Sequence, residues 1–357
     1  MKKMKIAWAC AALAGSTAAL AQSSVTLYGV IDTAVTRVSA SGAGSRIGLS
    51  SGGNLPSRLG FRGAEDLGGG LKAGFTLEGS LGTDTGTGSA NGGLAFQRRS
   101  TVSLIGPFGE LRLGRDFTPT WWNISLFDPF NARGVGTSQA VNNFGYNTVY
   151  NSNAIGYVLP EGLGGIFGQL QYAFGEKASD TPNRRQGNSW SGRLGYASGP
   201  LNAAVSYATF RQVIGASDTA PVTIGRNLDI ANAAVSWDFG VVKPLLYWGR
   251  EQVKGAPAGA NRLDSLLVGA TAPLGNGELR ATYARYDLHD SADDFRKLSL
   301  GYGYLLSKRT QVYATVARLN NKGAATQALS ADGLAAVGQT RPEGSSSGVD
   351  LGIRHIF

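Results

Sequence analysis

The sequence predicts an all-β protein whose strands close into one barrel across a membrane, and three observations carry this prediction. Glycine supplies 52 of the 357 residues and charged residues only 16%, which favours turns and strands over helices. No stretch beyond the N-terminal segment approaches the ~18 consecutive apolar residues of a transmembrane helix. Segment after segment instead alternates apolar residues with small or polar ones, which is the period of a strand with two different faces.

The first 21 residues are predicted to be a signal peptide. Lys2, Lys3 and Lys5 precede an apolar stretch, and Ala19-Leu20-Ala21 forms a small-x-small cleavage site. Its removal takes away three lysines and no acids, so 33 basic residues become 30 against 24 acidic ones, a net charge of +6. The only cysteine is lost with it, so no disulfide can form. The mature chain, 22–357, is predicted to be a single barrel domain.

Sixteen segments alternate in this way, and most are close to ten residues long. A strand tilted by about 45° needs about 9–11 residues to cross a bilayer, whereas strands of soluble proteins usually have about five or six. The even number and the length favour a transmembrane barrel over a soluble β-sandwich. The predicted strands are 24–33, 57–62, 71–80, 96–105, 110–117, 149–158, 165–175, 189–198, 201–210, 227–238, 241–250, 263–272, 278–287, 296–305, 310–319 and 348–357.

The connections alternate between short and long, which predicts short turns on the periplasmic rim and long loops on the extracellular rim. Sixteen strands enclose a water-filled lumen too wide for side chains to fill, so inward residues can be charged. An outward Arg or Lys at the middle of the membrane would cost about 2–4 kcal/mol. The predicted long loops are 34–56, 81–95, 118–148, 176–188, 211–226, 251–262, 288–295 and 320–347.

Several segments resemble the general porins of β-proteobacteria. Ser23 to Asp32 is similar to their mature start, Ser57 to Ala73 to their second hairpin, and Gly352 to Phe357 to their C-terminus. The resemblance implies a 16-stranded antiparallel homotrimer in the Gram-negative outer membrane, surrounded by outer-membrane lipid and lipopolysaccharide. It also implies a water-filled channel for passive passage of ions and small hydrophilic solutes. The terminal Phe357 resembles the signal that barrel-insertion machinery reads.

The same resemblance implies that one long loop folds into the barrel and narrows it. The longest, 118–148, is the candidate, and it carries Trp121, Trp122, Asp128 and Arg133. A disordered surface loop is the alternative, since loops above ~12–15 residues are usually either functional or disordered. The two tryptophans favour the infolded loop. Related porins often have a basic residue where Tyr150 stands, so this wall departs from their pattern.

Strand geometry predicts which charged residues of the wall lie at the height of this loop. A tilted strand advances about 2.5 Å per residue along the barrel axis, which places Arg58, Arg99 and Glu78 near mid-membrane. The excess of arginine there predicts mild anion selectivity. At each position a hydrated charge with no special role is the alternative. Further lumen charges are predicted at Arg62, Lys72, Arg112, Arg193, Arg280 and Lys297.

The sequence offers little for catalysis, and we expect no enzyme, metal or cofactor. Gly68-Gly69-Gly70 lacks the ending of a phosphate-binding loop and suits a turn better. His289 lies between acids in a predicted loop, where solvated charge is the simpler interpretation. Basic residues are spread along alternating positions and form no nucleic-acid patch. An outer-membrane barrel hydrolase, a plugged adhesin-type barrel and an exported β-sandwich are the alternative classes.

Overall fold

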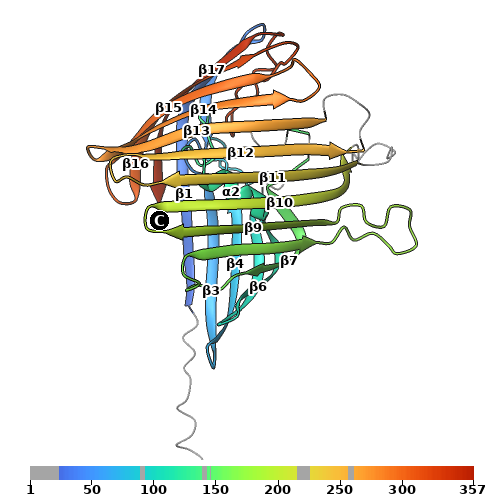
Figure 1. Ribbon diagram of the computed structural model, residues 1–357. Helices are drawn as coiled ribbons and strands as arrows, with labels where there is room; N and C mark the ends of the chain where they lie inside the picture. The colour runs from blue at the N-terminus through green and yellow to red at the C-terminus, as the bar shows by residue number, and fades with distance from the viewer. Residues whose placement is uncertain (1–23, 89–92, 139–142, 145, 215–225, 256–260) are drawn as a thin grey trace, which may run out of the picture.

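The computed structural model describes residues 24–88, 93–138, 143–144, 146–214, 226–255 and 261–357, and these form one antiparallel barrel (Figure 1). The predicted signal peptide lies outside the described residues. The elements are β1 (Ser24–Ala40), β2 (Gly44–Ser51), β3 (Arg58–Gly68), β4 (Leu71–Ser80), β5 (Arg99–Gly106), β6 (Gly109–Phe117), α2 (Pro119–Leu126), β7 (Tyr150–Val158), β8 (Ile166–Ala173), β9 (Ser189–Ser198), β10 (Leu201–Ile214), β11 (Arg226–Trp237), β12 (Lys243–Lys254), β13 (Arg262–Leu274), β14 (Gly277–Leu288), β15 (Phe295–Leu305), β16 (Thr310–Asn321) and β17 (Ser345–Ile356).

Strand β1 closes the barrel. One edge pairs with β17 from Val30 to Ala40. The other edge pairs with β3 over Ser24–Val30 and with β2 over Thr33–Ala40. Because β2 and β3 occupy one position in succession, the seventeen described strands make a barrel of sixteen positions, which confirms the prediction.

The prediction of a loop at 34–56 is wrong over most of this range. β1 continues to Ala40 and forms a hairpin with β2. The alternation persists there, with Ala34 and Val38 only 1% exposed and Val35 48% exposed, but small and polar neighbours obscure it in the sequence. Only the short segment 52–57 leaves the sheet, and it is held by the carboxylate of Asp32, which accepts the backbone N–H groups of Asn54 (2.8 Å) and Leu55 (2.6 Å).

The two faces of each strand have the polarity of a membrane barrel. On β15 the outward Leu298 and Leu300 are 58% and 52% exposed, whereas the inward Lys297 and Ser299 are 2% and 1% exposed. Apolar side chains outside and polar ones inside reverse the arrangement of a soluble protein. In Figure 1 the near strands β9–β12 cross the far strands β1, β3 and β4 steeply, as expected for tilted strands.

Within the described residues, the structure contains no helix with the length and apolar character required to span a bilayer. Helix α2 lies inside the barrel, behind β10 and β11 in Figure 1.

The C-terminal residue completes the closure. The backbone N–H and C=O of Phe357 bond to the C=O and N–H of Gly29, both at 3.1 Å. Its ring covers Gly29, because a Cβ at that position would lie 2.4 Å from the Phe357 ring. Only glycine permits this approach.

Deletion of Phe357 is therefore expected to impair barrel assembly. It removes two backbone hydrogen bonds, each worth about 0.5–1.5 kcal/mol, at the seam where β1 meets β17. The amount of heat-modifiable folded protein in the outer membrane should fall, with synthesis and export unchanged. Phe357→Trp, which keeps the backbone bonds and an aromatic ring, is the control. Normal folded yield of the deletion would contradict the prediction.

Candidate functional site: a constricted lumen

The segment between β6 and β7 turns into the barrel directly after Phe117, which confirms the predicted infolded loop. Thr118 fastens its base, since the hydroxyl donates to the C=O of Thr148 (2.6 Å) and accepts the N–H of Trp121 (3.2 Å). Thr118 thereby caps α2, and proline follows at the first helical position, where its missing N–H costs nothing. Both ends of the loop are thus joined at the wall.

Helix α2 is anchored to the wall formed by β9 and β11. The Asn123 amide is fully buried and donates to Oδ1 of Asn232 (3.0 Å), while Nε of Arg193 donates to Oδ1 of Asn123. Asn232 also donates to the C=O of Thr120 (3.3 Å). Arg193, predicted as a lumen charge, therefore holds the helix in place.

The second half of the loop continues across the lumen to strands β12–β17. Asp350 on β17 accepts the N–H of Val135 (2.9 Å), and Nζ of Lys297 on β15 donates to the C=O of Thr137. Glu251 on β12 accepts the amide of Asn143 (2.7 Å). The loop therefore covers the β9–β17 side of the lumen and leaves the β2–β6 side open.

Two glycines let the loop approach the wall closely. A Cβ at Gly301 would lie 2.8 Å from the ring of Phe130, and one at Gly269 would lie 3.0 Å from Cγ of Pro129. Phe130 is only 4% exposed. The tip of the loop is thus packed against β13 and β15 and does not hang free in the channel.

Asp128 shapes this tip. Its two carboxylate oxygens accept the backbone N–H groups of Phe130 (2.8 Å) and Ser138 (2.7 Å), and the residue is 4% exposed. Burial raises the pKa of Asp128, while these two N–H groups and the charge of Lys297 act to lower it. Because the carboxylate is enclosed, Asp128 does not present a free charge to ions in the passage.

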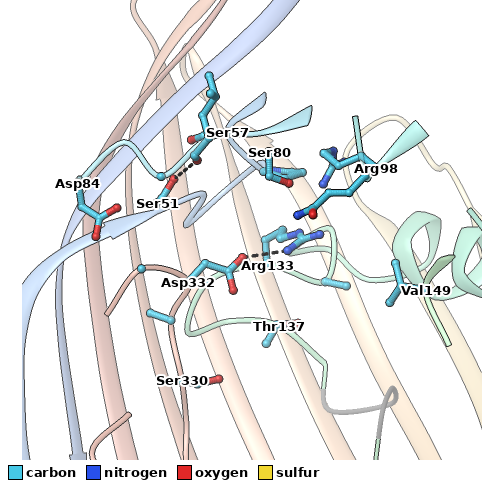
Figure 2. A pocket seen from close by; sticks show the side chains of 18 of the residues that line it. Ser51, Ser57, Ser80, Asp84, Arg98, Arg133, Thr137, Val149, Ser330 and Asp332 are labelled. Atoms are coloured by element: carbon cyan, nitrogen blue, oxygen red, sulfur yellow. Dashed lines mark hydrogen bonds and ion pairs between the residues drawn. The ribbon is translucent and has the colours of Figure 1, made fainter. Parts of the chain in front are cut away.

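The open side of the lumen is a cavity of about 720 Å³ between the loop and the wall (Figure 2). Its charged lining residues are Arg98, Arg133, Asp84 and Asp332. In Figure 2 Arg133 and Asp332 meet in the middle of the cavity, and Arg98 extends from the neighbouring wall.

Beside this cavity one carboxylate joins two arginines. Glu78 binds Nε of Arg98 at 2.6 Å and Nε of Arg58 at 3.2 Å. We call Arg58, Glu78 and Arg98 the arginine triad. Arg98 also donates to the hydroxyl of Tyr150 (3.2 Å), the residue at which the sequence departs from the related porins.

The structure thus brings Arg58 and Glu78 together but pairs Arg99 elsewhere. Arg99 binds Asp116 at 2.7 Å, and Asp116 in turn binds Arg112 at 2.5 Å. Arg98 was not predicted as a site residue because the strand was expected to begin at residue 96, whereas β5 begins at Arg99. A residue outside the ladder does not obey strand alternation, so Arg98 and Arg99 both reach inward partners.

A second loop also enters the lumen, which the sequence did not indicate. The connection between β16 and β17 places Leu329 in the core, 2% exposed, and its Asp332 C=O accepts the N–H of Ser51 (2.8 Å). The Asp332 carboxylate binds Arg133 of the constriction loop at 2.9 Å. Two loops distant in the chain therefore meet across the cavity.

The remaining predicted residues lie where the wall or the loop packs. Trp121 is 6% exposed and lies below Arg133, whose guanidinium is 5.8 Å from the ring centroid. Trp122 packs on Phe117, with 5.2 Å between ring centroids.

The other predicted lumen charges each have a partner on the wall. Arg62 covers the ring of Tyr28 at 5.3 Å, Arg112 also binds Glu110 at 2.8 Å, Arg280 binds Glu278 at 2.8 Å, and Lys72 faces Asp66 across β3 and β4.

Among the described residues no three His, Cys, Asp or Glu side chains gather as metal ligands. His289 is exposed, and its nearest carboxylate partner, Asp290, lies 3.7 Å away.

The comparisons with known proteins agree with this geometry. A family model for Gram-negative porins matches residues 7–324. Outer membrane porin protein 32 of Delftia acidovorans is 41% identical over the full length of both chains, and an outer membrane porin of Bordetella pertussis is 32% identical, again over both full lengths. The solved structure of an anion-selective porin from Comamonas acidovorans superposes with a TM-score of 0.85 at 39% identity, covering 94% of this chain and 100% of the other.

Asp128→Ala is expected to loosen the tip of the constriction loop. Two buried N–H groups lose their acceptor and Lys297 loses a buried counter-charge, which together cost about 3–5 kcal/mol. Single-channel recordings should show more open-channel noise, and thermal unfolding should begin at a lower temperature.

The matched control is Asp332→Asn, whose carboxylate side chain is 62% exposed and whose loss costs at most about 1 kcal/mol. Unchanged noise and unfolding temperature for Asp128→Ala would show that this carboxylate does not hold the loop.

Proposed function

The chain belongs to the Gram-negative porin family, and from this premise we propose that its barrel forms a homotrimeric, mildly anion-selective channel of the outer membrane. It is a general diffusion porin that passes ions and small hydrophilic solutes passively. Passage through an open lumen requires no reacting group, and the proposed activity involves no catalysis and no cofactor.

The proposed selectivity rests mainly on which charges the constriction loop covers. Three carboxylates that belong to the loop or bond it are enclosed, with exposures of 0% for Asp350 and 4% for Asp128 and Glu251. Two cations bond the loop, Lys297 at 2% exposure and Arg193, whose Nε donates to Asn123. The loop therefore withdraws more negative than positive charge from the water-filled passage.

The charges on the open wall also favour anions. The arginine triad has two cations and one anion, a formal charge of +1 beside the cavity. The Arg133–Asp332 pair is neutral. Asp84 opposes the triad from the segment after β4, so the preference is mild. Since salt screens charges beyond about 8–10 Å, the triad should outweigh distant loop charges.

Arg98→Ser is expected to lower the anion preference more than Arg99→Ser. Arg98 lines the cavity within a triad of formal charge +1, whereas Arg99 lies in a network with Arg112, Asp116 and Glu110 whose formal charge is zero. A unit charge about 7 Å from a permeating ion contributes about 0.6 kcal/mol in water, so the permeability ratio should change by about two- to threefold. Arg58→Ser should act in the same direction, and Glu78→Gln and Asp84→Asn in the opposite one.

Zero-current potentials in a KCl gradient measure these changes. Lys254→Gln, on the outer face of β12, serves as the control and should leave the potential unaltered. Cation preference in the wild type, unmoved by Arg58→Ser or Arg98→Ser, would refute the proposed constriction.

Removing either partner of the Arg133–Asp332 ion pair between the two infolded loops is expected to shift the ion selectivity, in opposite directions for the two residues. Asp332→Asn leaves Arg133 unpaired in the cavity and should raise anion preference, and Arg133→Gln leaves Asp332 unpaired and should lower it. The double variant should return near the wild-type reversal potential, because it removes one charge of each sign. Equal shifts of the same sign in both single variants would contradict this assignment.

We further propose that the mature chain begins at Gln22 and that barrel-insertion machinery assembles it into trimers. The porin relatives and the outward apolar faces of the strands support self-association in the membrane. Light scattering in mild detergent, corrected for bound detergent, should give three times the mass of one chain, and N-terminal sequencing should start at Gln22. A monomeric mass would contradict the trimer, and an uncleaved N-terminus would contradict the signal peptide.

A further inference from the structure

One acid that lines the cavity of Figure 2 has no role in the structure itself. Asp84 lies in the segment that follows β4. Within the described part of the chain, no base lies at ion-pair distance from its carboxylate and no N–H or O–H donates to it. Asp332, the other acid of the lining, is instead paired with Arg133 at 2.9 Å. Asp84 therefore keeps its full capacity to accept hydrogen bonds from a solute.

The segment that carries Asp84 is fixed in place. The hydroxyl of Ser51 donates to the C=O of Leu81 (2.9 Å) and accepts the N–H of Thr83 (3.2 Å). On the other side the segment approaches the second infolded loop closely, since a Cβ at Gly333 would lie 3.0 Å from both carboxylate oxygens of Asp84. The acceptor is thus held at one position on the cavity wall while both of its oxygens lack a partner in the described chain.

A donor of the opposite charge lies at the other end of the cavity. In Figure 2 Asp84 is on the left and Arg98 on the right. Arg98 gives its Nε to Glu78 (2.6 Å) and its Nη1 to Tyr150 (3.2 Å). Because a guanidinium has five N–H donors, three remain for the carboxylate of a solute.

The remaining lining adds neutral polar groups to these two ends. Ser80, Ser330 and Gln97 line the cavity, and their side chains bond to no other side chain or backbone group among the described residues. Hydroxyl and amide groups both donate and accept hydrogen bonds. The cavity of about 720 Å³ is within the range of pockets that hold small ligands, about 300–1,000 Å³.

We propose that this cavity binds sugar acids, which are carboxylates whose carbon chain carries several hydroxyl groups. The carboxylate of the solute bonds to Arg98, its hydroxyls donate to Asp84, and Ser80 and Ser330 exchange hydrogen bonds with the chain between. This proposal rests on the proposed channel function and adds a class of solute to it. An amino acid would suit the charge of Asp84, but it would leave the hydroxyl and amide groups of the lining bonded only to water.

Block of the single-channel current in a planar bilayer measures the affinity of the purified protein for added solutes. Gluconate and hexanoate share chain length and charge but differ in their hydroxyl groups. Sorbitol has the hydroxyls without the carboxylate, and 6-aminohexanoate has an ammonium in their place. We expect gluconate to bind at least about tenfold more tightly than each of the other three, because only gluconate satisfies both ends of the cavity and its lining. Equal or tighter binding of any of them would overturn the proposal.

The variant Asp84→Ala distinguishes hydrogen bonding from charge. Loss of a negative charge alone strengthens the attraction for every anion, so hexanoate should bind up to about two- to threefold more tightly. Gluconate also loses the acceptor of its hydroxyls, and a hydrogen bond to a charged group is worth more than that gain. Its affinity should therefore fall by at least about fivefold. Tighter binding of both anions would show that Asp84 acts by charge alone and would overturn the proposal.

Asp290→Ala is the matched control. It removes an acid whose side chain is 67% exposed, in the loop between β14 and β15 and outside the lining of the cavity. The affinities for gluconate and hexanoate should both equal those of the wild type. An equal loss of gluconate binding in the two variants would indicate a general effect of surface charge and would refute the site.

A milder variant keeps the test decisive if Asp84→Ala forms no channels. Asp84→Asn retains the size of the side chain and one neutral acceptor, so it should bind gluconate less tightly than the wild type. An affinity equal to or above that of the wild type would refute the proposal.

The reversal potential of the wild type in a KCl gradient separates this inference from the proposed function. Anion preference without a preference for gluconate would refute the class of solute and leave the channel function intact. Absence of conducting channels would refute the proposed function itself.

Discussion

Pairing of backbone polar groups is the constraint on which the rest of this structure depends. In hydrocarbon no water can bond to an exposed N–H or C=O, so a sheet can exist there only when its two edges meet. Here the edges meet along β1 and β17, and the terminal Phe357 extends that seam onto Gly29. Closure at sixteen positions then leaves a lumen wide enough for water, and the inward faces of the strands become free to carry charge.

The lumen is divided unevenly because the constriction loop is bonded to one side of it. Asn232, Lys297 and Asp350 hold the loop through direct hydrogen bonds from β11, β15 and β17. These groups are buried by the loop that they bind, so their charges stabilise a shape and do little for a passing ion. On the open side, Arg98 of the arginine triad lines the cavity although only 5% of it is exposed. Position relative to the loop, more than the number of charges, thus decides which residues a solute meets.

The strand pattern could be predicted from the sequence because it depends on local chemistry. Alternation along β15 and β17, and strand lengths matched to a bilayer, need only neighbouring residues. The extension of β1 to Ala40, and with it the hairpin to β2, was missed because inward Ala34 and Thr36 on β1 are too small or polar to reveal the apolar period. Pairing of Glu78 with Arg98, and entry of Asp332 into the lumen, depend on loops whose course is set by contacts with distant strands. Such contacts leave no period in the sequence. Asp128 shows the same limit, since its burial depends on Ser138 and Lys297 closing around it.

The close approach of Phe130 to Gly301, and of Pro129 to Gly269, has a consequence for the bore of the channel. How deeply the loop seats against β13 and β15 fixes how much room is left on the opposite side, beside the arginines. The width available to a solute is therefore determined on the opposite wall, by two glycines that lie behind the loop and do not contact the solute. A porin of this design can change its cut-off size by a single methyl group on the far wall, while every residue that lines the passage stays the same.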